Sequence, residues 1–230
     1  MDIYKNVERG KVAERVIISG DPGRVNQLAK MLDNAEMLNN TDSLVAYTGL
    51  YSGKPLTVAT HGIGGASASL IINGLIKHGA KSIVRLGTAG SLKENIEVGD
   101  VIVVTGAHYS PGGTLSYDYR LSPAPDFALT KKLYQALKQA DIKVHLGTVF
   151  SKNAFYTLDD LNPWLISIGT LALEMECATL MSISNIHNIR SACVLIVSDN
   201  VVKKTRMYTA SELKKFVDVS SLAVMDAIVS

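Results

Sequence analysis

Two arginines beside glycine-rich segments are the residues of this sequence best suited to hold an anion. Arg24 ends the turn at residues 20–24, and Arg85 lies in an apolar run before the segment 87–90. Glycines let backbone N–H groups approach an anion, and a guanidinium offers paired donors that match phosphate oxygens. Thr88 adds a hydroxyl. Together they favour a phosphate site, although each motif alone is explained as well by a tight turn and a structural ion pair.

Two carboxylates, Glu176 and Asp199, each follow an apolar run. One carboxylate can accept two hydrogen bonds from a cis-diol such as the ribose 2′- and 3′-hydroxyls, which is the role open to Glu176. A carboxylic acid can share a proton with a leaving group, which is the role open to Asp199. The structural alternatives are a Glu favoured by the dipole at a helix N-terminus and an Asp that forms a turn or an N-cap.

Apolar side chains near these carboxylates suit a nucleoside. Met175 can pack as a soft floor under a sugar ring, and Phe155 and Tyr156 can stack on a flat base. Core packing is the commoner role for such aromatics.

The glycine-rich segment 61–65 does not make a dinucleotide fingerprint. Ser67 stands where that motif requires its third glycine, and the preceding strand is the second arm of a predicted hairpin. A loop that lets backbone approach an anion or a sugar fits better. The five histidines are scattered with no pair at metal-ligand spacing, so we expect no metal.

Short β-branched runs alternate with helical segments along the chain. Glycine and proline turns separate them, Asp126 is a candidate N-cap, and Gly79 is a natural helix stop. The expected strands are 15–19, 44–48, 56–60, 82–86, 101–105, 143–150, 171–174 and 191–197, and the expected helices begin at Pro22 and cover 66–78, 126–140, 176–187 and 211–228.

This alternation predicts one domain over residues 1–230, a three-layer α/β/α sandwich around a central mixed β-sheet. The sheet is mixed because the segments 44–48 and 56–60 form a hairpin. In such folds ligands collect at the carboxyl ends of strands, where the residues discussed above lie.

Composition excludes several classes of protein. Apolar residues make up 47% and charged residues 19% of 230 residues, enough for a large core. A net charge of +2 without a basic block argues against nucleic acid and anionic membranes as partners. We expect no signal peptide and no membrane span. Cys177 and Cys193 lie in apolar runs, which favours buried free thiols in the cytoplasm over a disulfide.

The set of motifs resembles the nucleoside phosphorylase family, which includes hexameric purine nucleoside phosphorylases, uridine phosphorylases and archaeal methylthioadenosine phosphorylases. The similarity covers essentially the whole chain in order. The motifs that carry it are residues 20–24, 85–90, Phe155-Tyr156, Glu174-Met175-Glu176 and Ser198-Asp199-Asn200.

The resemblance implies phosphorolysis of purine ribonucleosides or deoxyribonucleosides to free base and (deoxy)ribose 1-phosphate. Inorganic phosphate is then the co-substrate and no cofactor is needed. It also implies a role in purine salvage and a homo-oligomer, usually a hexamer built as a trimer of dimers. The implied site residues are Gly20, Arg24, Arg85 and Thr88 for phosphate, Met175 and Glu176 for ribose, Phe155 and Ser198 for the base, and Asp199 as the acid at N7 of the base.

Three positions depart from the bacterial hexameric pattern. Tyr4 stands where those enzymes place a His that reaches the neighbouring subunit's site, and it could still hydrogen-bond the sugar there. Asp42 stands where they supply an Arg, so we expect the loop 39–43 to point elsewhere. The basic partner of Asp199 is replaced by Leu213, next to Lys214.

Purines are the favoured substrates, with 5′-methylthioadenosine among the candidates. The segment 157–170 lacks the Gln/Arg pair of uridine-cleaving relatives, and Asp199 is the purine-type residue. Three alternatives stay open: a uridine phosphorylase, a hydrolytic nucleosidase, and a non-catalytic nucleoside-binding module. Two arginines argue against hydrolysis because water needs no such clamp, and retention of both carboxylates argues against a binding module.

Overall fold

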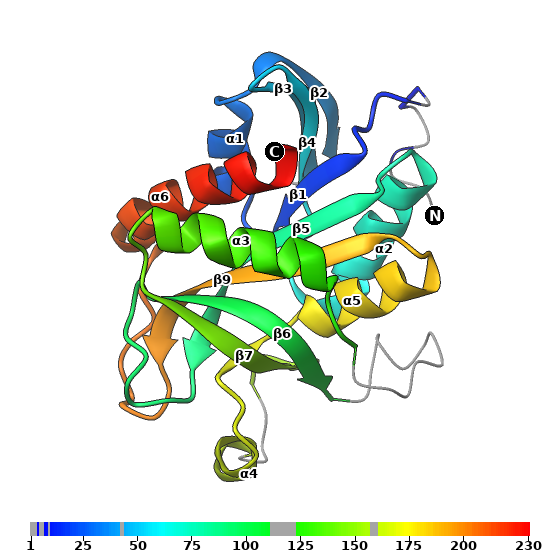
Figure 1. The fold of residues 1–230 in the computed structure, drawn as a ribbon. Helices are drawn as coiled ribbons and strands as arrows, with labels where there is room; N and C mark the ends of the chain where they lie inside the picture. The colour runs from blue at the N-terminus through cyan, green and yellow to red at the C-terminus, as the bar shows by residue number, and fades with distance from the viewer. Residues whose placement is uncertain (1–3, 5–6, 9, 42–43, 111–122, 157–160) are drawn as a thin grey trace.

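A mixed β-sheet forms the centre of the computed structural model, which describes residues 4, 7–8, 10–41, 44–110, 123–156 and 161–230 (Figure 1). Within these residues the sheet has nine strands in the order β2-β3-β4-β1-β5-β8-β7-β6-β9. The strands are β1 (Arg15–Ser19), β2 (Asp33–Thr41), β3 (Leu44–Tyr51), β4 (Lys54–Thr60), β5 (Ser82–Ser91), β6 (Val101–Tyr109), β7 (Val144–Ser151), β8 (Ala172–Glu174) and β9 (Arg190–Asn200).

One further pairing changes the shape of the sheet. Strand β5 also pairs in parallel with β9, so β5, β8, β7, β6 and β9 form a closed ring of pairings. Strands β1, β4, β5 and β9 run parallel to their neighbours in the row β4-β1-β5-β9. Their carboxyl ends therefore share one edge, as the sequence predicted.

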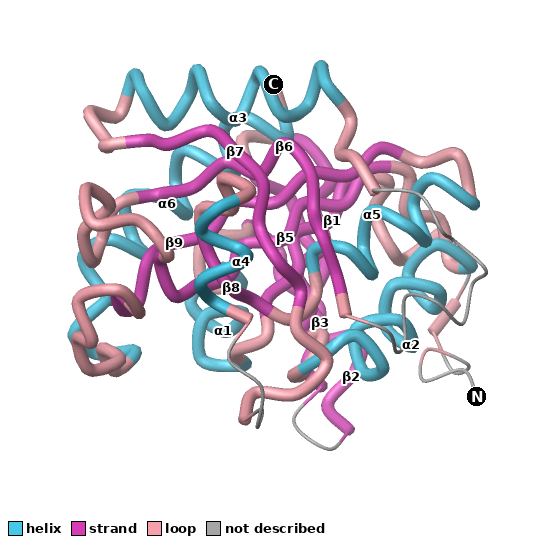
Figure 2. The backbone as a smooth tube through the Cα atoms, turned by 90° about the horizontal axis from the view of Figure 1, so that it is seen from below, coloured by secondary structure: helices cyan, strands magenta, loops and turns pink. Residues whose placement is uncertain are grey.

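Helices cover both faces of the sheet, which confirms the three-layer α/β/α arrangement (Figure 2). Helices α2 (Gly64–Lys77) and α5 (Cys177–Ile186) pack on one face, while α1 (Pro22–Ala29), α3 (Phe127–Gln139) and α6 (Ala210–Val229) pack on the other. The short helix α4 (Asn162–Ser167) lies apart from both layers, at the bottom of Figure 1. In the described part of the chain, every helix is too short or too polar to span a bilayer.

Strand periodicity divides the core into these two layers. Consecutive side chains of a strand point to opposite faces. In β1, Val16 and Ile18 therefore join the cluster under α2 and α5, while Ile17 joins the cluster under α1, α3 and α6. In β9, Leu195 and Ile196 divide in the same way.

Local signals account for several helix ends. The Asp126 carboxylate accepts a hydrogen bond from the Leu129 N–H at 2.7 Å, which confirms it as the N-cap of α3. Gly79 follows α2 with a φ of 124°, a conformation that glycine adopts without steric cost.

Two elements were missed by the sequence prediction. Strand β2 is an edge strand whose residues are mostly exposed, so it shows no apolar alternation, and the expected loop at 39–43 begins inside it. Helix α4 has only six residues, too few to show helical periodicity. The other predicted strands and helices are confirmed, with the hairpin extending over β3 and β4. Strands β5 and β9 are longer than predicted, because the pairing between them continues through residues 87–91 and 198–200.

The buried face of β9 yields a stability prediction. Leu195 is completely buried, so Leu195→Ala should lower the free energy of unfolding by about 2–5 kcal/mol through the lost burial and the cavity left behind. Urea denaturation measures the change. The matched control is Leu222→Ala, at a side chain that is 47% exposed, which should change stability by no more than about 0.5 kcal/mol. Equal effects at the two positions would contradict this packing.

Candidate active site

Arg24 is a buried cation without a carboxylate partner. Its side chain leaves α1 and donates from Nη1 to the carbonyl of Leu86 at 2.9 Å and to Oγ of Ser19 at 3.3 Å. Among the described residues no carboxylate lies within 4.0 Å of it. Burial lowers the pKa of Arg24, the negative charge of Asp21 opposes this effect, and the positive charge of Arg85 adds to it. An anion bound at this position would balance the buried positive charge of Arg24.

The positive charge of Arg85, in contrast, is balanced by two carboxylates. It lies in β5 and its guanidinium forms a buried ion pair with Glu176, and Nη2 is 3.6 Å from Oε2 of Glu174. Burial would lower the pKa of Arg85, but the negative charge of Glu176 and its neighbours outweighs this and raises it. A Cβ at Gly87 would overlap Nη1 of Arg85, so a larger residue at this position of the phosphate motif would displace the guanidinium.

Glu176 connects the two helices of one layer. It occupies the N-cap position of α5, but its side chain makes no cap hydrogen bond. Oε1 instead accepts from the N–H of Gly64 at 2.6 Å, at the start of α2, and Oε2 accepts from Arg85. Burial alone would raise the pKa of Glu176, but Arg85 and other donors lower it, so the group is ionised. Glu176 thus lies at the N-terminus of α5, as the helix-dipole alternative expected, but its hydrogen bonds go to Arg85 and to the start of α2.

Glu174 holds the start of α5, a role that was not predicted. Its Oε2 accepts from the N–H groups of Glu176 and Cys177 at 2.8 and 2.9 Å. Ser151 donates its hydroxyl to Oε1 of Glu174 and accepts from the Ala178 N–H at 3.0 Å. The only sequence signal was a second carboxylate at a strand end, two residues before Glu176.

His61 is a second residue that the sequence prediction missed. It is completely buried, and neither ring nitrogen has a hydrogen-bond partner in the described part of the chain. Burial first, and then the charge of Arg85, lower its pKa to about 4, so the ring is neutral near pH 7. A Cβ at Gly20 would lie 3.4 Å from its Cε1, which places the ring beside the predicted phosphate turn.

Asp199 lies inside the end of β9 and is neither a helix cap nor a turn residue. Its Oδ1 accepts from the hydroxyl of Ser198 at 2.7 Å, and that hydroxyl is also 3.3 Å from the Ala89 carbonyl. A Cβ at Gly90 would lie 2.9 Å from Oδ2 of Asp199, so the carboxylate lies across Gly90 of β5.

The remaining predicted residues lie around this edge. Thr88 is half-buried in β5 between Arg85 and Gly90. Met175 is close to the start of α2, since a Cβ at Gly64 would lie 3.9 Å from its Cε. Phe155 is 55% exposed and meets the ring of Tyr156 edge-on, with 5.1 Å between centroids.

The three departures from the family pattern differ in their placement. Tyr4 is completely buried in its own chain, next to Gly74 near the C-terminal end of α2 and to the C-cap residue His78. Its role in a neighbouring subunit stays a prediction. Asp42 lies outside the described residues. Leu213 lies in α6 with its side chain in the core, so it contributes no polar contact to Asp199.

No metal centre is formed by the described residues, where no three His, Cys, Asp or Glu side chains come together.

Comparison with known proteins connects this arrangement to one family. Residues 14–229 match the sequence profile of the phosphorylase superfamily. A guanosine phosphorylase from Halorubrum lacusprofundi is 34% identical over 199 residues, which are 85% of this chain and 82% of that protein. DeoD-type purine nucleoside phosphorylases from Exiguobacterium sp. and Bacillus velezensis are 32% and 30% identical, covering 88% and 97% of this chain and 87% and 98% of theirs.

The two buried arginines should differ in their effect on stability. Arg24→Met removes a buried cation that forms no ion pair among the described residues, so the free energy of unfolding should stay within about 1 kcal/mol. Arg85→Met leaves Glu174 and Glu176 buried without their cation and should lower it by about 3–5 kcal/mol. Urea unfolding in phosphate-free buffer measures both, and similar losses for the two variants would refute the contrast.

His61 should make the protein sensitive to acid. Its pKa is about 4 in the fold, against 6.5 in an exposed ring, so between these pH values the unfolded chain binds the extra proton. The free energy of unfolding then falls as the pH drops from 6.5, by about 1.4 kcal/mol per pH unit, and His61 has no such effect above this range.

The measurement compares the unaltered protein with His61→Phe by urea unfolding at pH 7 and pH 5. The stability difference between them should shift by about 2 kcal/mol in favour of the variant at the lower pH. Stability differences that are equal at both pH values would show that the ring titrates normally.

Proposed function

Because the chain belongs to the phosphorylase superfamily, we propose that it cleaves the N-glycosidic bond of purine ribonucleosides and deoxyribonucleosides with inorganic phosphate. The products are the free base and (deoxy)ribose 1-phosphate. The relatives named above are a guanosine phosphorylase and purine nucleoside phosphorylases, which supports a purine base as the leaving group.

The observation that carries the proposal is the buried charge of Arg24, in the first turn of α1, whose hydrogen bonds go to a carbonyl and a hydroxyl and which forms no ion pair among the described residues. Phosphate would receive donors from Arg24, Arg85, Thr88 and the backbone at Gly20, and its charge would balance the arginine that has no carboxylate. Arg85 can share its donors between phosphate and Glu176, because a guanidinium has five N–H groups in a fixed fork.

The sugar and the base have matching partners. Glu176 uses one lone pair on each oxygen for Gly64 and Arg85, which leaves acceptor capacity for the ribose 2′- and 3′-hydroxyls. Met175 would pack under the sugar ring, and Phe155 with Ser198 would border the base. The exposed ring of Phe155 is free to stack on a planar ligand.

Phosphate attacks C1′ while the glycosidic bond lengthens and the sugar gains oxocarbenium-like charge. The bound phosphate stabilises that charge because it is anionic and held on the face opposite the base. Asp199 in its acid form donates to N7 of the departing purine, which neutralises an otherwise poor leaving anion. Both interactions strengthen in the transition state and therefore accelerate the reaction rather than only binding substrate.

Assembly and location are parts of the same proposal. We expect a homo-oligomer, a hexamer arranged as a trimer of dimers, and exposed apolar side chains such as Tyr156 (89% exposed) and Trp164 (55% exposed) offer contact area. Two buried free thiols, Cys177 and Cys193, fit a reducing cytoplasm, where the enzyme would serve purine salvage. Light scattering on the purified protein measures the oligomer.

A substrate panel tests the reaction. Guanosine, inosine, adenosine, 5′-methylthioadenosine and uridine are incubated with and without phosphate, and free base and sugar 1-phosphate are quantified. Release of purine should require phosphate and yield equal amounts of both products. Release without phosphate would identify a hydrolase, preference for uridine a uridine phosphorylase, and no release a binding module.

Asp199→Asn should lower kcat for guanosine by about 10²–10⁴-fold, because the amide cannot give a proton to N7. The KM for phosphate should stay nearly unchanged, since Asp199 does not contact the arginines in the described structure. Asp218→Asn, on the exposed side of α6 where it pairs with Lys214, is the matched control. Full activity of Asp199→Asn would remove Asp199 from the reaction.

A further inference from the structure

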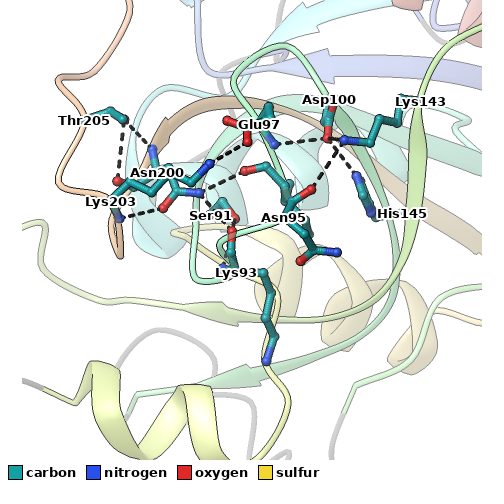
Figure 3. Close-up of polar contacts among 11 residues, drawn as sticks. Ser91, Lys93, Asn95, Glu97, Asp100, Lys143, His145, Asn200, Lys203 and Thr205 are labelled. Carbon is teal, nitrogen blue, oxygen red and sulfur yellow. Dashed lines mark hydrogen bonds and ion pairs between the residues drawn. The ribbon is translucent and has the colours of Figure 1, made fainter.

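Asn200 is a buried amide directly after the proposed acid. Its side chain is 1% exposed, and Nδ2 donates to the carbonyls of Lys93 and Ile96 at 2.8 and 2.9 Å. Oδ1 accepts from the N–H of Lys203 at 2.9 Å (Figure 3). Because neighbouring side chains in a strand point to opposite faces, Asp199 and Asn200 face opposite sides of the end of β9.

The end of β9 lacks a strand partner on one side. Strand β6 pairs with β9 only from Val101, opposite Ile196, whereas β5 continues to the end and pairs Gly90 with Asp199. The β5–β9 register also shifts just before Gly90, which disrupts the ladder locally. The Asn200 side chain fills the unsupported side, since its two N–H donors bind the backbone of the segment that connects β5 to β6.

That connecting segment is itself held in place (Figure 3). Asp100 accepts from the Glu97 N–H at 3.0 Å and pairs with Lys143 and His145, each at 2.8 Å. Lys203 forms an exposed ion pair with Glu97. Asn200 therefore connects the end of β9 to a segment that other contacts also hold in place.

Asn200 also closes the turn that follows β9. The N–H of Asn200 donates to Oγ1 of Thr205 at 2.7 Å, and the N–H of Thr205 donates back to the Asn200 carbonyl at 3.0 Å. Asp199, by comparison, receives one side-chain hydrogen bond among the described residues, from Ser198. The position of its carboxylate is thus set mainly by the backbone that Asn200 anchors.

We propose that Asn200 is a positioning residue for the cleavage reaction, holding Asp199 at hydrogen-bond distance from N7 of the leaving purine. This inference rests on the proposed function. Small displacements of a catalytic group lower rates steeply, by up to about 100-fold for 1 Å. Loss of the Asn200 amide should therefore lower turnover only where the acid is needed.

Guanosine and 7-methylguanosine separate these cases. A purine methylated at N7 already carries the positive charge that protonation would supply, so it leaves without an acid. Asn200→Ala should lower kcat for guanosine by about 10–100-fold and kcat for 7-methylguanosine by less than about threefold. The loss of kcat in Asp199→Asn shows how large the effect is when the acid is removed completely. A circular dichroism spectrum equal to that of the wild-type protein shows that each variant is folded.

Two further variants complete the experiment. Lys203→Ala removes the exposed ion pair with Glu97 but keeps the backbone N–H that Asn200 uses, so it should behave as wild type. Thr205→Val removes the hydroxyl that accepts from the Asn200 N–H and lies 3.5 Å from the Asn200 carbonyl, at an exposed residue, and should show a smaller loss selective for guanosine. If Asn200→Ala does not fold, Thr205→Val tests the proposal in its place.

Equal losses on both nucleosides, or no loss on guanosine, would overturn the positioning role. If Asp199→Asn is selective for guanosine and the Asn200 and Thr205 variants are not, only this inference fails. If Asp199→Asn is itself unselective, the proposed role of Asp199 fails with it.

Discussion

The buried ion pair between Arg85 and Glu176 is the interaction on which the rest of the site depends. It joins the middle of the sheet to the start of α5, and through Gly64 it also reaches the start of α2. Two charges taken out of water are tolerated only when each finds its partner and its remaining hydrogen bonds. The pair therefore determines where both helices of one layer begin relative to β5, and it brings a cation and a carboxylate to the same edge.

The neighbouring charges are not balanced in the same way. Arg85 has two carboxylates, Arg24 has none among the described residues, and His61 stays neutral because it is buried beside these cations. A phosphate ion would complete the charge balance of this group. The fold thus keeps an unsatisfied positive charge next to a glycine turn, which costs stability and favours an anion.

Much of the fold and of the site could be predicted because both leave local signals. Apolar runs with period two or helical spacing mark the core elements, and glycines or charged residues that interrupt them mark strand ends such as Gly20 and Asp199. The edge strand β2 and the short helix α4 leave no such signal, since neither has a buried face of sufficient length. His61 and Glu174 were missed because a lone His or Glu shows nothing in sequence about its partners.

The sequence by itself determined the α/β class, the order of the elements other than β2 and α4, and the residue types at each strand end. Only the tertiary structure decided which of these residues meet: Glu176 as the counter-charge of Arg85, 91 positions away, and Asn200 as the anchor of the 93–96 segment. The sequence also did not show where Tyr4 lies, and the structure places it in the core of its own chain. Such contacts depend on strand register and on ring closure between β5 and β9, and a one-residue change in register would turn every side chain to the other face.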